Sequence, residues 1–367
     1  NGTITLGANN SSRVGVDGTG SVLTVGPNVT IRGENGTIGN QLYLATANSG
    51  IINNGRISAD VAGGTLEMLQ AAVTNNGLME AQNGGTLKLS SNITGTSTGQ
   101  FAAGANSVIL QNGVSVTGTI NSTGSGAFRA TNSGSNFFNG VTVNGNVDLA
   151  TAQSSVRSIN GLVLNGNINL NNNSVLAFEG SQTLSGNGTI NLGNLTNNNL
   201  VAVDGTGSVL TIAGGVKIQG ENGVVGNQRY LGTANSSVVN NGLISANVNG
   251  GQISLQQATF SNNNILEARN GGLLNLASAV TNSVTGQVNA HGNGLVVLNN
   301  TSITGGSVNT SSGGAMRATN SAANFMNDVT ENGNLDLAAA TSGVRVAGAM
   351  TLGSTGVASI NSGSALV

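Results

Sequence analysis

Residues 139–149 read NGVTVNGNVDL, and residues 160–170 read NGLVLNGNINL, 21 positions later. In both stretches Val, Ile or Leu alternates with polar residues on either side of an internal Asn-Gly dipeptide. Alternation at a period of two sends every second side chain to the same face of a β-strand. Asn-Gly tolerates the positive φ angles of tight corners. Each stretch therefore predicts two short strands joined by a corner.

Nearly the same spacing recurs elsewhere in the chain. Asn53-Asn54-Gly55 returns as Asn75-Asn76-Gly77, and GGTLEML from Gly63 returns as GGTLKLS from Gly84. An isolated Asn-Gly is typical of a hairpin, whereas corners at a fixed period favour stacked coils. Leucine-rich repeats have a similar length, but Gly and Asn interrupt every run and long-chain helix formers are scarce. The period predicts an all-β parallel β-helix of about 17 coils of roughly 19–22 residues, a rod about 80 Å long.

A longer repeat covers the whole chain. VGVDGTGSVLT from Val14 returns as VAVDGTGSVLT from Val201. At the same offset, RGENGTIGNQLYL from Arg32 returns as QGENGVVGNQRYL from Gln219. The chain is therefore two tandem copies, which we place at residues 1–186 and 187–367, continuous with each other and each of about nine coils. Tandem copies indicate length and display rather than a single catalytic pocket.

Composition limits the classes of partner. Only 7% of the 367 residues are charged, the net charge is −2, and there are 58 Gly, 1 Pro and no Cys. An ordinary domain has roughly 25% charged residues, so Asn, Ser, Thr and Gly must form most of this surface. The 11 basic residues form no run, which argues against nucleic acid. No apolar stretch approaches the roughly 20 residues that span a bilayer, so we expect no membrane insertion in this segment.

Residues with catalytic or metal-binding chemistry are few. A single His291 and no Cys exclude a zinc site, and we expect His291 to face solvent. Asp17 and Glu34 are separated by less than one coil, so they do not stack as a glycosidase carboxylate pair. VDGTG at Asp17 and Asp204 is a weak substitute for a calcium-binding loop and fits a turn better. We predict no enzyme activity, no cofactor and no metal.

Two sets of residues are candidates for repeated contacts. Asn residues at equivalent corners, Asn139 with Asn160 and Asn144 with Asn165, can stack as amide ladders along the axis. The second set combines a carboxylate, an amide and an aromatic ring in both copies. It is either a glycan or lateral-contact site, or a loop whose polar groups cap turns and whose Tyr packs against the shaft. Its members are Glu34, Gln41 and Tyr43 in the first copy and Glu221, Gln228 and Tyr230 in the second.

Two adjacent bulky pairs, Phe137-Phe138 and Phe325-Met326, occupy equivalent positions in the copies. Alternation predicts that one residue of each pair points into the core while the other packs under a turn. The alternative is an exposed apolar strip for lateral association.

The stretches GENGTIGN from Gly33, NNGRISA from Asn53 and NNGLMEAQNGGTLKL from Asn75 resemble filamentous-haemagglutinin-type adhesins and autotransporter passenger regions. The resemblance covers the whole chain, and it lies in the style of the repeat. It implies a right-handed β-helix, export from a Gram-negative cell, and a place outside the cell or at the bacterial cell surface, with adhesion or biofilm roles.

We therefore expect a stalk segment of a long secreted bacterial fibre or adhesin, whose partners are the flanking β-helical coils of the same chain. The alternative is a binding module whose Asn/Thr/Ser face engages polysaccharide or neighbouring fibres in a biofilm matrix. That alternative requires a face with the same residue types at every coil.

Overall fold

The computed structural model describes residues 1–44, 48–69, 71–96, 98–193, 198–232, 234–338, 341–361 and 363–367. In this part of the chain every regular element is a β-strand, and the strands pair in parallel as a β-solenoid of about 16 turns. The predicted parallel β-helix is thus confirmed. The chain divides into two compact units, residues 1–169 (unit 1) and 170–367 (unit 2). That division falls before the start of the second sequence copy at Asn187.

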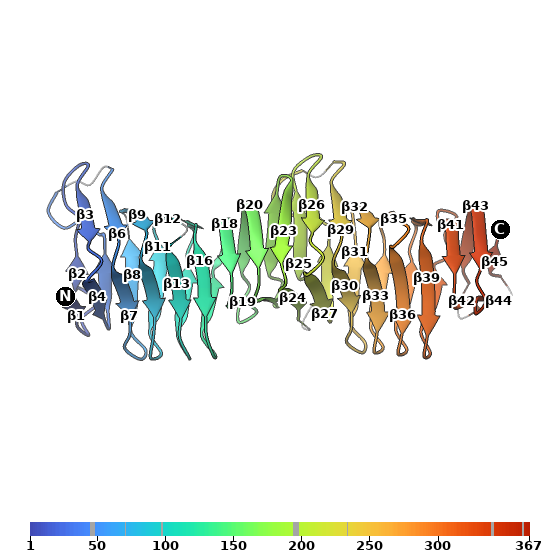
Figure 1. The fold of residues 1–367 in the computed structure, drawn as a ribbon, viewed down its shortest axis with the longest axis horizontal. Helices are drawn as coiled ribbons and strands as arrows, with labels where there is room; N and C mark the ends of the chain where they lie inside the picture. The colour runs from blue at the N-terminus through green and yellow to red at the C-terminus, as the bar shows by residue number, and fades with distance from the viewer. Residues whose placement is uncertain are drawn as a thin grey trace. The chain divides into compact units, whose positions relative to one another are not determined.

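In unit 1 each turn contributes one strand to each of three columns, and each strand pairs with the strands one turn away in its column (Figure 1). Column 1 contains β3 (Val22–Val25), β6 (Gly50–Asn53), β9 (Ala72–Asn75), β12 (Ile93–Gly95), β15 (Ser115–Val116) and the first part of β18 (Asn132–Val143). Column 2 contains β1 (Gly2–Leu6), β4 (Val29–Gly33), β7 (Arg56–Ala59), β10 (Leu78–Ala81), β13 (Gln100–Ala103), β16 (Thr119–Ser122) and the end of β18. Column 3 contains β2 (Arg13–Val14), β5 (Gly36–Ile38), β8 (Thr65–Leu69), β11 (Thr86–Ser90), β14 (Val108–Gln111), β17 (Ala127–Ala130) and β19 (Asn146–Leu149). β20 (Ser155–Leu164) pairs with β18 along both of its parts, and β21 (Asn167–Leu170) contains the unit boundary.

Unit 2 repeats this arrangement. Its column 1 contains β23 (Gln182–Gly186), β26 (Val209–Ile212), β29 (Ser237–Asn240), β32 (Thr259–Asn262), β35 (Val280–Asn282), β38 (Ser302–Thr304) and the first part of β41 (Phe325–Glu331). Its column 2 contains β24 (Thr189–Leu192), β27 (Lys217–Gly220), β30 (Leu243–Ala246), β33 (Ile265–Arg269), β36 (Gln287–His291), β39 (Ser307–Ser311) and the end of β41. Its column 3 contains β22 (Val175–Glu179), β25 (Leu200–Asp204), β28 (Asn222–Val225), β31 (Gln252–Leu255), β34 (Leu273–Leu276), β37 (Leu295–Leu298), β40 (Ala315–Ala318), β42 (Asn334–Leu337) and β44 (Val357–Ile360). β43 (Gly343–Leu352) pairs with β41, and β45 (Ala365–Leu366) pairs with β43.

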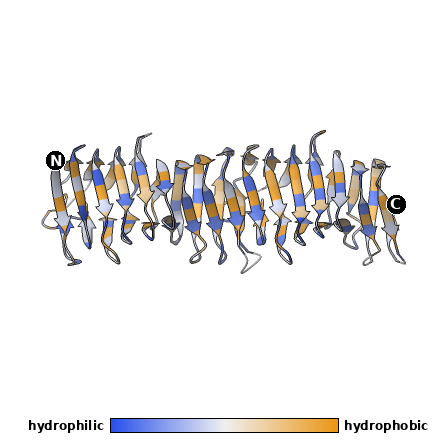
Figure 2. Cartoon of the chain, turned by 60° about the horizontal axis from the view of Figure 1, so that its bottom comes forward, coloured by the Kyte–Doolittle hydropathy of each residue, from blue (hydrophilic) through white to orange (hydrophobic). Residues whose placement is uncertain are grey.

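The interior is a narrow apolar core built from one row of side chains per column, and the alternation of apolar and polar residues is visible along the strands in Figure 2. In column 2 of unit 1, Ile57, Met79 and Phe101 lie in register and are fully buried. The Phe128 ring of column 3 lies edge-on to Phe101 at 6.0 Å and to Phe138 of column 1 at 5.6 Å. All three columns thus meet in one core. A single turn cannot bury these side chains, so each turn depends on its neighbours.

Turn length varies with the loops. In column 2, Leu78 pairs with Gln100 and Gln100 pairs with Thr119, offsets of 22 and 19 residues, whereas Gly2 pairs with Val29 at an offset of 27 residues. The predicted length of 19–22 residues therefore holds for some turns and is too short for the turns that carry longer loops. A much longer turn separates Gly36 from its partner Leu66 in column 3, because the stretch that carries Tyr43 lies within it. The number of residues between two paired strands therefore depends on the lengths of the loops in that turn and is not constant along the chain.

The bulky pairs follow alternation. Phe138 and Met326 are fully buried, which confirms that one residue of each pair points inward. Their neighbours are half-buried, and each lies beneath an arginine guanidinium rather than beneath a turn. These cation–π pairs are Arg157 over Phe137 at 4.5 Å and Arg345 over Phe325 at 4.7 Å from the ring centroids.

One corner requires glycine in unit 2. Gly220 has φ +140°, and a Cβ added there would lie 2.1 Å from the Leu192 carbonyl oxygen one turn away. We expect Gly220→Ala to lower the free energy of unfolding by more than about 2 kcal/mol, because backbone must move. Gly250→Ala is the matched control: φ is +76° but no atom lies within 4 Å, so the loss is about 1 kcal/mol. Urea denaturation of both variants checks this, and equal losses would contradict the close approach.

Candidate functional site

The surface corner asparagines form amide ladders. Asn160 Nδ2 donates to Asn139 Oδ1 at 2.7 Å, and Asn165 Nδ2 donates to Asn144 Oδ1 at 2.9 Å. Asn144 Nδ2 donates in turn to Asn121 Oδ1 at 3.1 Å, so this ladder covers three successive turns. The structure thus brings together both asparagine pairs singled out from the sequence. Uncharged amides satisfy one another here without any ion pair.

A second set of ladders lies inside the protein. Asn240 Nδ2 donates to Asn262 Oδ1, and Asn262 Nδ2 donates to Asn282 Oδ1, each at 2.8 Å. Asn53 and Asn75 form the equivalent rung in unit 1, also at 2.8 Å, and are fully buried. Sequence reasoning noted the repeated Asn-Asn-Gly but did not identify the first Asn as buried. Alternation from the inward Ile51 would have shown it, since the two positions have the same parity.

Two glutamates of column 2, Glu80 and Glu267, point away from the apolar core but are still buried, with 3% and 5% of their surface exposed. Glu80 accepts hydrogen bonds from Ser58 Oγ at 2.7 Å and Arg56 Nε at 2.6 Å. Glu267 accepts one from Ser245 Oγ at 2.6 Å. The same Ser–Glu pair is therefore built in both units.

The cation beside this carboxylate differs between the units. The position of Arg56 is occupied by Leu243 in unit 2. There Glu267 instead has Arg269 Nε and His291 Nε2 near its two oxygens, each at 3.3 Å. His291 is thus only partly solvent-facing: its side chain is 37% exposed and lies against Glu267. A buried carboxylate requires a compensating charge, and the two copies supply it from different turns.

The aspartate of VDGTG anchors a loop. Asp17 accepts hydrogen bonds from the backbone N–H of Leu42 at 2.7 Å and of Tyr43 at 3.1 Å. The Leu42 hydrogen bond, above all, holds the pKa of Asp17 below its ordinary value. Asp204 receives the equivalent bonds from Arg229 and Tyr230 at 2.7 and 3.0 Å. The motif forms a turn, as the sequence indicates.

The tyrosines of the candidate set have different surroundings in the two units. Tyr230 packs against an apolar cluster of column 3 in unit 2, whereas Tyr43 is 84% exposed. Gln41 is half-buried and Gln228 is exposed, both in the same loops as the tyrosines. The cluster beneath Tyr230 consists of Val175, Ala177, Leu200 and Ala202.

The glutamates of the set lie at corners between columns 2 and 3. A Cβ on Gly64 would come within 2.3 Å of the Glu34 carbonyl oxygen, and one on Gly251 within 2.4 Å of that of Glu221. The neighbouring Asn35 Oδ1 accepts the Thr65 N–H at 2.9 Å. These contacts explain the repeated GENG as a corner on which the next turn rests. The hydrogen bonds place Asp17, rather than Glu34, at the base of the Tyr43 loop.

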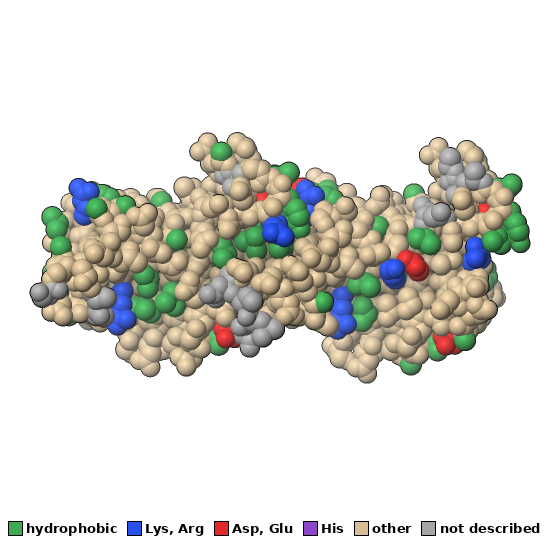
Figure 3. Space-filling model, turned by 180° about the vertical axis from the view of Figure 1, so that it is seen from behind, with side chains coloured by type: hydrophobic (Ala, Val, Ile, Leu, Met, Phe, Trp, Pro, Cys, Tyr) green, Lys and Arg blue, Asp and Glu red, His purple; other side chains and the backbone are tan. Residues whose placement is uncertain are grey.

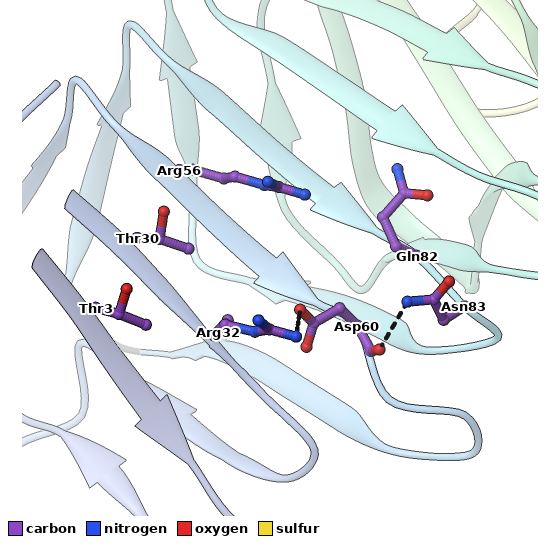
Figure 4. Close-up of a pocket in the computed structure, with 7 residues that line it drawn as sticks. All are labelled: Thr3, Thr30, Arg32, Arg56, Asp60, Gln82 and Asn83. Carbon is purple, nitrogen blue, oxygen red and sulfur yellow. Dashed lines mark hydrogen bonds and ion pairs between the residues drawn. The ribbon is translucent and has the colours of Figure 1, made fainter. Parts of the chain in front are cut away.

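A polar groove of about 410 Å³ lies over unit 1 (Figure 4), lined by Thr3, Thr30, Arg32, Arg56, Asp60, Gln82 and Asn83. Arg32 Nη2 lies 2.7 Å from Asp60 Oδ2, and Arg56 pairs with Glu80. In both arginines an Nη group is therefore already engaged by a carboxylate of the protein. Such a groove offers hydrogen-bond donors and acceptors without net charge.

The groove is not duplicated. Positions equivalent to Thr30, Arg32, Arg56 and Asp60 are occupied in unit 2 by Lys217, Gln219, Leu243 and Asn247. On the face shown in Figure 3, charged side chains are few, and most of the surface is backbone or uncharged side chains. The groove therefore lacks the repetition that a binding face along the shaft would show.

Within the described ranges, no three His, Cys, Asp or Glu side chains are grouped as metal ligands. The described part of the chain also contains no helix of the length and apolar character needed to cross a bilayer. Comparisons with protein-family models, curated proteins and solved structures found no match to this chain.

Proposed function

We propose that this chain is a stalk segment of a long secreted bacterial fibre or adhesin, extending a filament at the cell surface or in a matrix. The observation that best supports this is that the contacts kept in both units join one turn to the next. They include the Asp17 and Asp204 loop anchors and the Ser58–Glu80 and Ser245–Glu267 pairs. Duplication has thus preserved stacking contacts.

The polar groove of unit 1 favours the stalk over a general binding module. A shaft that engages polysaccharide with every coil needs a face whose residues recur, and the groove lacks this because both of its arginines are replaced in unit 2. The resemblance to filamentous-haemagglutinin-type repeats supports the extracellular, bacterial setting of the proposal.

The mechanism is geometric. Parallel pairing in register lets each new turn repeat the contacts of the turn before it, and each adds about 4.8 Å. Stability then accumulates from neighbouring turns, so length carries no penalty in fold stability. Asn, Ser and Thr side chains on the surface hydrogen-bond to water and to one another without needing charge.

Insertion of a third copy tests the proposal. We would insert a second Val14–Leu200 segment after Leu200 and compare both proteins by small-angle X-ray scattering. A stalk predicts that the maximum dimension increases by about 38 Å, because one copy contributes about eight of the roughly 16 turns at a strand spacing of about 4.8 Å, and that the cross-section is unchanged. A Gly-Ser insert of the same length is the control for a flexible spacer. A thicker cross-section without added length would contradict the stalk.

A further inference from the structure

Both units carry an arginine–aspartate pair that joins neighbouring turns of column 3 and leaves the arginine side chain partly exposed. A pocket of about 480 Å³ lies on the outward face of column 3 in unit 1, bounded by the stretch that follows β19. Its floor is apolar, its rim carries hydroxyl and amide groups, and an arginine–aspartate pair lies at one side. The residues that carry the argument are Val108, Leu110, Arg129, Thr131, Asn132 and Asp148.

Both carboxylate oxygens of Asp148 accept hydrogen bonds from other groups of the protein. Its Oδ1 accepts the N–H of Ala150 at 2.9 Å and of Thr151 at 3.2 Å. Its Oδ2 accepts Arg129 Nε at 2.9 Å and also the Thr151 hydroxyl. Burial alone would raise the pKa of Asp148, but the hydrogen bonds from Thr151 and Ala150 and the charge of Arg129 lower it below the ordinary value. An ionised Asp148 therefore fixes Arg129 from the side.

The two terminal nitrogens of the Arg129 guanidinium are available to a ligand. Only its Nε is bonded to Asp148, and within the ranges that the structure describes its Nη1 and Nη2 make no hydrogen bond. The side chain is 35% exposed. The two Nη groups form a planar fork that matches a carboxylate with two parallel hydrogen bonds. Leu110, the register neighbour of Arg129 one turn away, supplies an apolar surface beside the fork.

The same arrangement is built in unit 2. Arg317 Nε donates to Asp336 Oδ2 at 2.9 Å, and the Arg317 side chain is 41% exposed. Val297 is its register neighbour, in the place of Leu110. The positions equivalent to Thr151 and Ala152 lie outside the described residues, so the comparison rests on the arginine, the aspartate and the aliphatic neighbour. Two units thus present the same arginine, held by the same aspartate, next to an aliphatic side chain.

We propose that Arg129 and Arg317 each bind the carboxylate of a uronic-acid residue in an acidic glycan. The aliphatic C–H face of the sugar ring lies on Leu110 or Val297, and its hydroxyls meet the polar rim. Asp148 and Asp336 are positioning residues. A peptide carboxylate is disfavoured because β14 is paired on both sides, by β11 and β17, and offers no free edge to a peptide backbone.

The test uses the whole chain and a tri-glucuronate probe. Side-chain Nε–Hε signals of arginine are followed by ¹⁵N NMR during titration, with Arg129→Lys and Arg317→Lys used to assign the two peaks. We expect saturable shifts of these two signals with tri-glucuronate and none with a neutral glucose trisaccharide. Each Lys variant should weaken binding at its own arginine by at least about tenfold, because lysine lacks the fork, and should leave binding at the other arginine unchanged.

Several outcomes would overturn the proposal. Equal shifts of the exposed Arg229 signal would show charge screening only, and Arg229→Lys is the control variant for that effect. Equal or stronger binding of an acidic tripeptide would make the site a peptide site. If Arg129→Lys is poorly folded, Leu110→Glu places a carboxylate beside an intact Arg129 and should abolish probe binding there. Persistence of binding in that variant would exclude the pocket, and the stalk proposal would be unaffected.

Discussion

Replacing Glu331 by valine is expected to stabilise the last turns of unit 2, and to do so far more at pH 9 than at pH 5. Glu331 is fully buried, in register between Val308 and Leu352, and neither carboxyl oxygen has a hydrogen-bond partner of ordinary geometry within the described residues. The equivalent position in unit 1 is Val143, also fully buried. A carboxyl group in unit 2 thus occupies a core position that holds an aliphatic side chain in unit 1.

The sign of the pH dependence follows from the pKa. Burial raises the pKa of Glu331 from 4.5 to about 8, and the Gly333 N–H offsets only part of that rise. The unfolded chain therefore releases the proton at lower pH than the folded one. The contribution of this group to stability is fully present below pH 4.5 and is lost as the pH rises to about 8. The loss is about 1.4 kcal/mol per pH unit, or roughly 4 kcal/mol between pH 5 and pH 9.

Charged groups on the neighbouring strands have other partners. Arg345 of β43 lies over the Phe325 ring, and Asp336 of β42 pairs with Arg317. Asp328, on the same strand as Glu331, accepts the Ala349 N–H at 2.9 Å. None of these contacts involves Glu331, so we expect the pH dependence of stability in this region to come mainly from the titration of the Glu331 carboxyl group.

Hydrogen exchange of β41 and β43 amides at pH 5 and pH 9 measures the prediction locally, because a solenoid need not unfold as one cooperative unit. Glu331→Gln should remove the pH dependence while leaving a buried polar group. Val143→Glu, the matched change in unit 1, should create the same pH dependence there. Wild-type protection that is equal at both pH values, after correction for intrinsic exchange, would refute the burial of an ionisable Glu331.

The second large effect is expected for Asn262→Ala, which should lower the free energy of unfolding by about 3 kcal/mol. Asn262 is fully buried, and its Nδ2 donates to Asn282 Oδ1, to the Gln287 carbonyl at 3.0 Å and to the Asn264 carbonyl at 3.2 Å. Its Oδ1 accepts from Asn240. Alanine leaves buried groups on three turns without their partner, so the cost exceeds that of one hydrogen bond.

Asn263→Ala is the matched control at the adjacent position. Asn263 Nδ2 also donates to an asparagine one turn back, Asn241 Oδ1, at 2.8 Å, but its side chain is partly exposed. Water replaces the lost partner there, and we expect a loss of only about 0.5–1 kcal/mol. Urea denaturation of both variants measures the two losses in the free energy of unfolding. Equal losses would mean that the buried ladder contributes no more than the surface one.

The sequence by itself determined the architecture. Alternating Val, Ile and Leu around Asn-Gly corners, as in residues 139–149, requires short strands, and the recurrence of these corners requires parallel stacking. The same reasoning identified the Asn139–Asn160 and Asn144–Asn165 pairs, which are joined in the structure. These features depend on the local periodicity of apolar residues and of Asn-Gly corners. Such a pattern involves residues that are close in sequence, so the sequence alone predicts it.

The tertiary structure decided which residues meet across turns. Glu34 and Tyr43 were grouped because they are close in sequence. Tyr43 lies in the long turn between Gly36 and its partner Leu66, and the hydrogen bonds join its loop to Asp17 of the preceding turn. Glu267 meets His291 for a related reason: both lie on column 2, one turn apart. A contact between turns depends on the length of the loop that separates them, and loop length changes register without changing the alternation that specifies the strands.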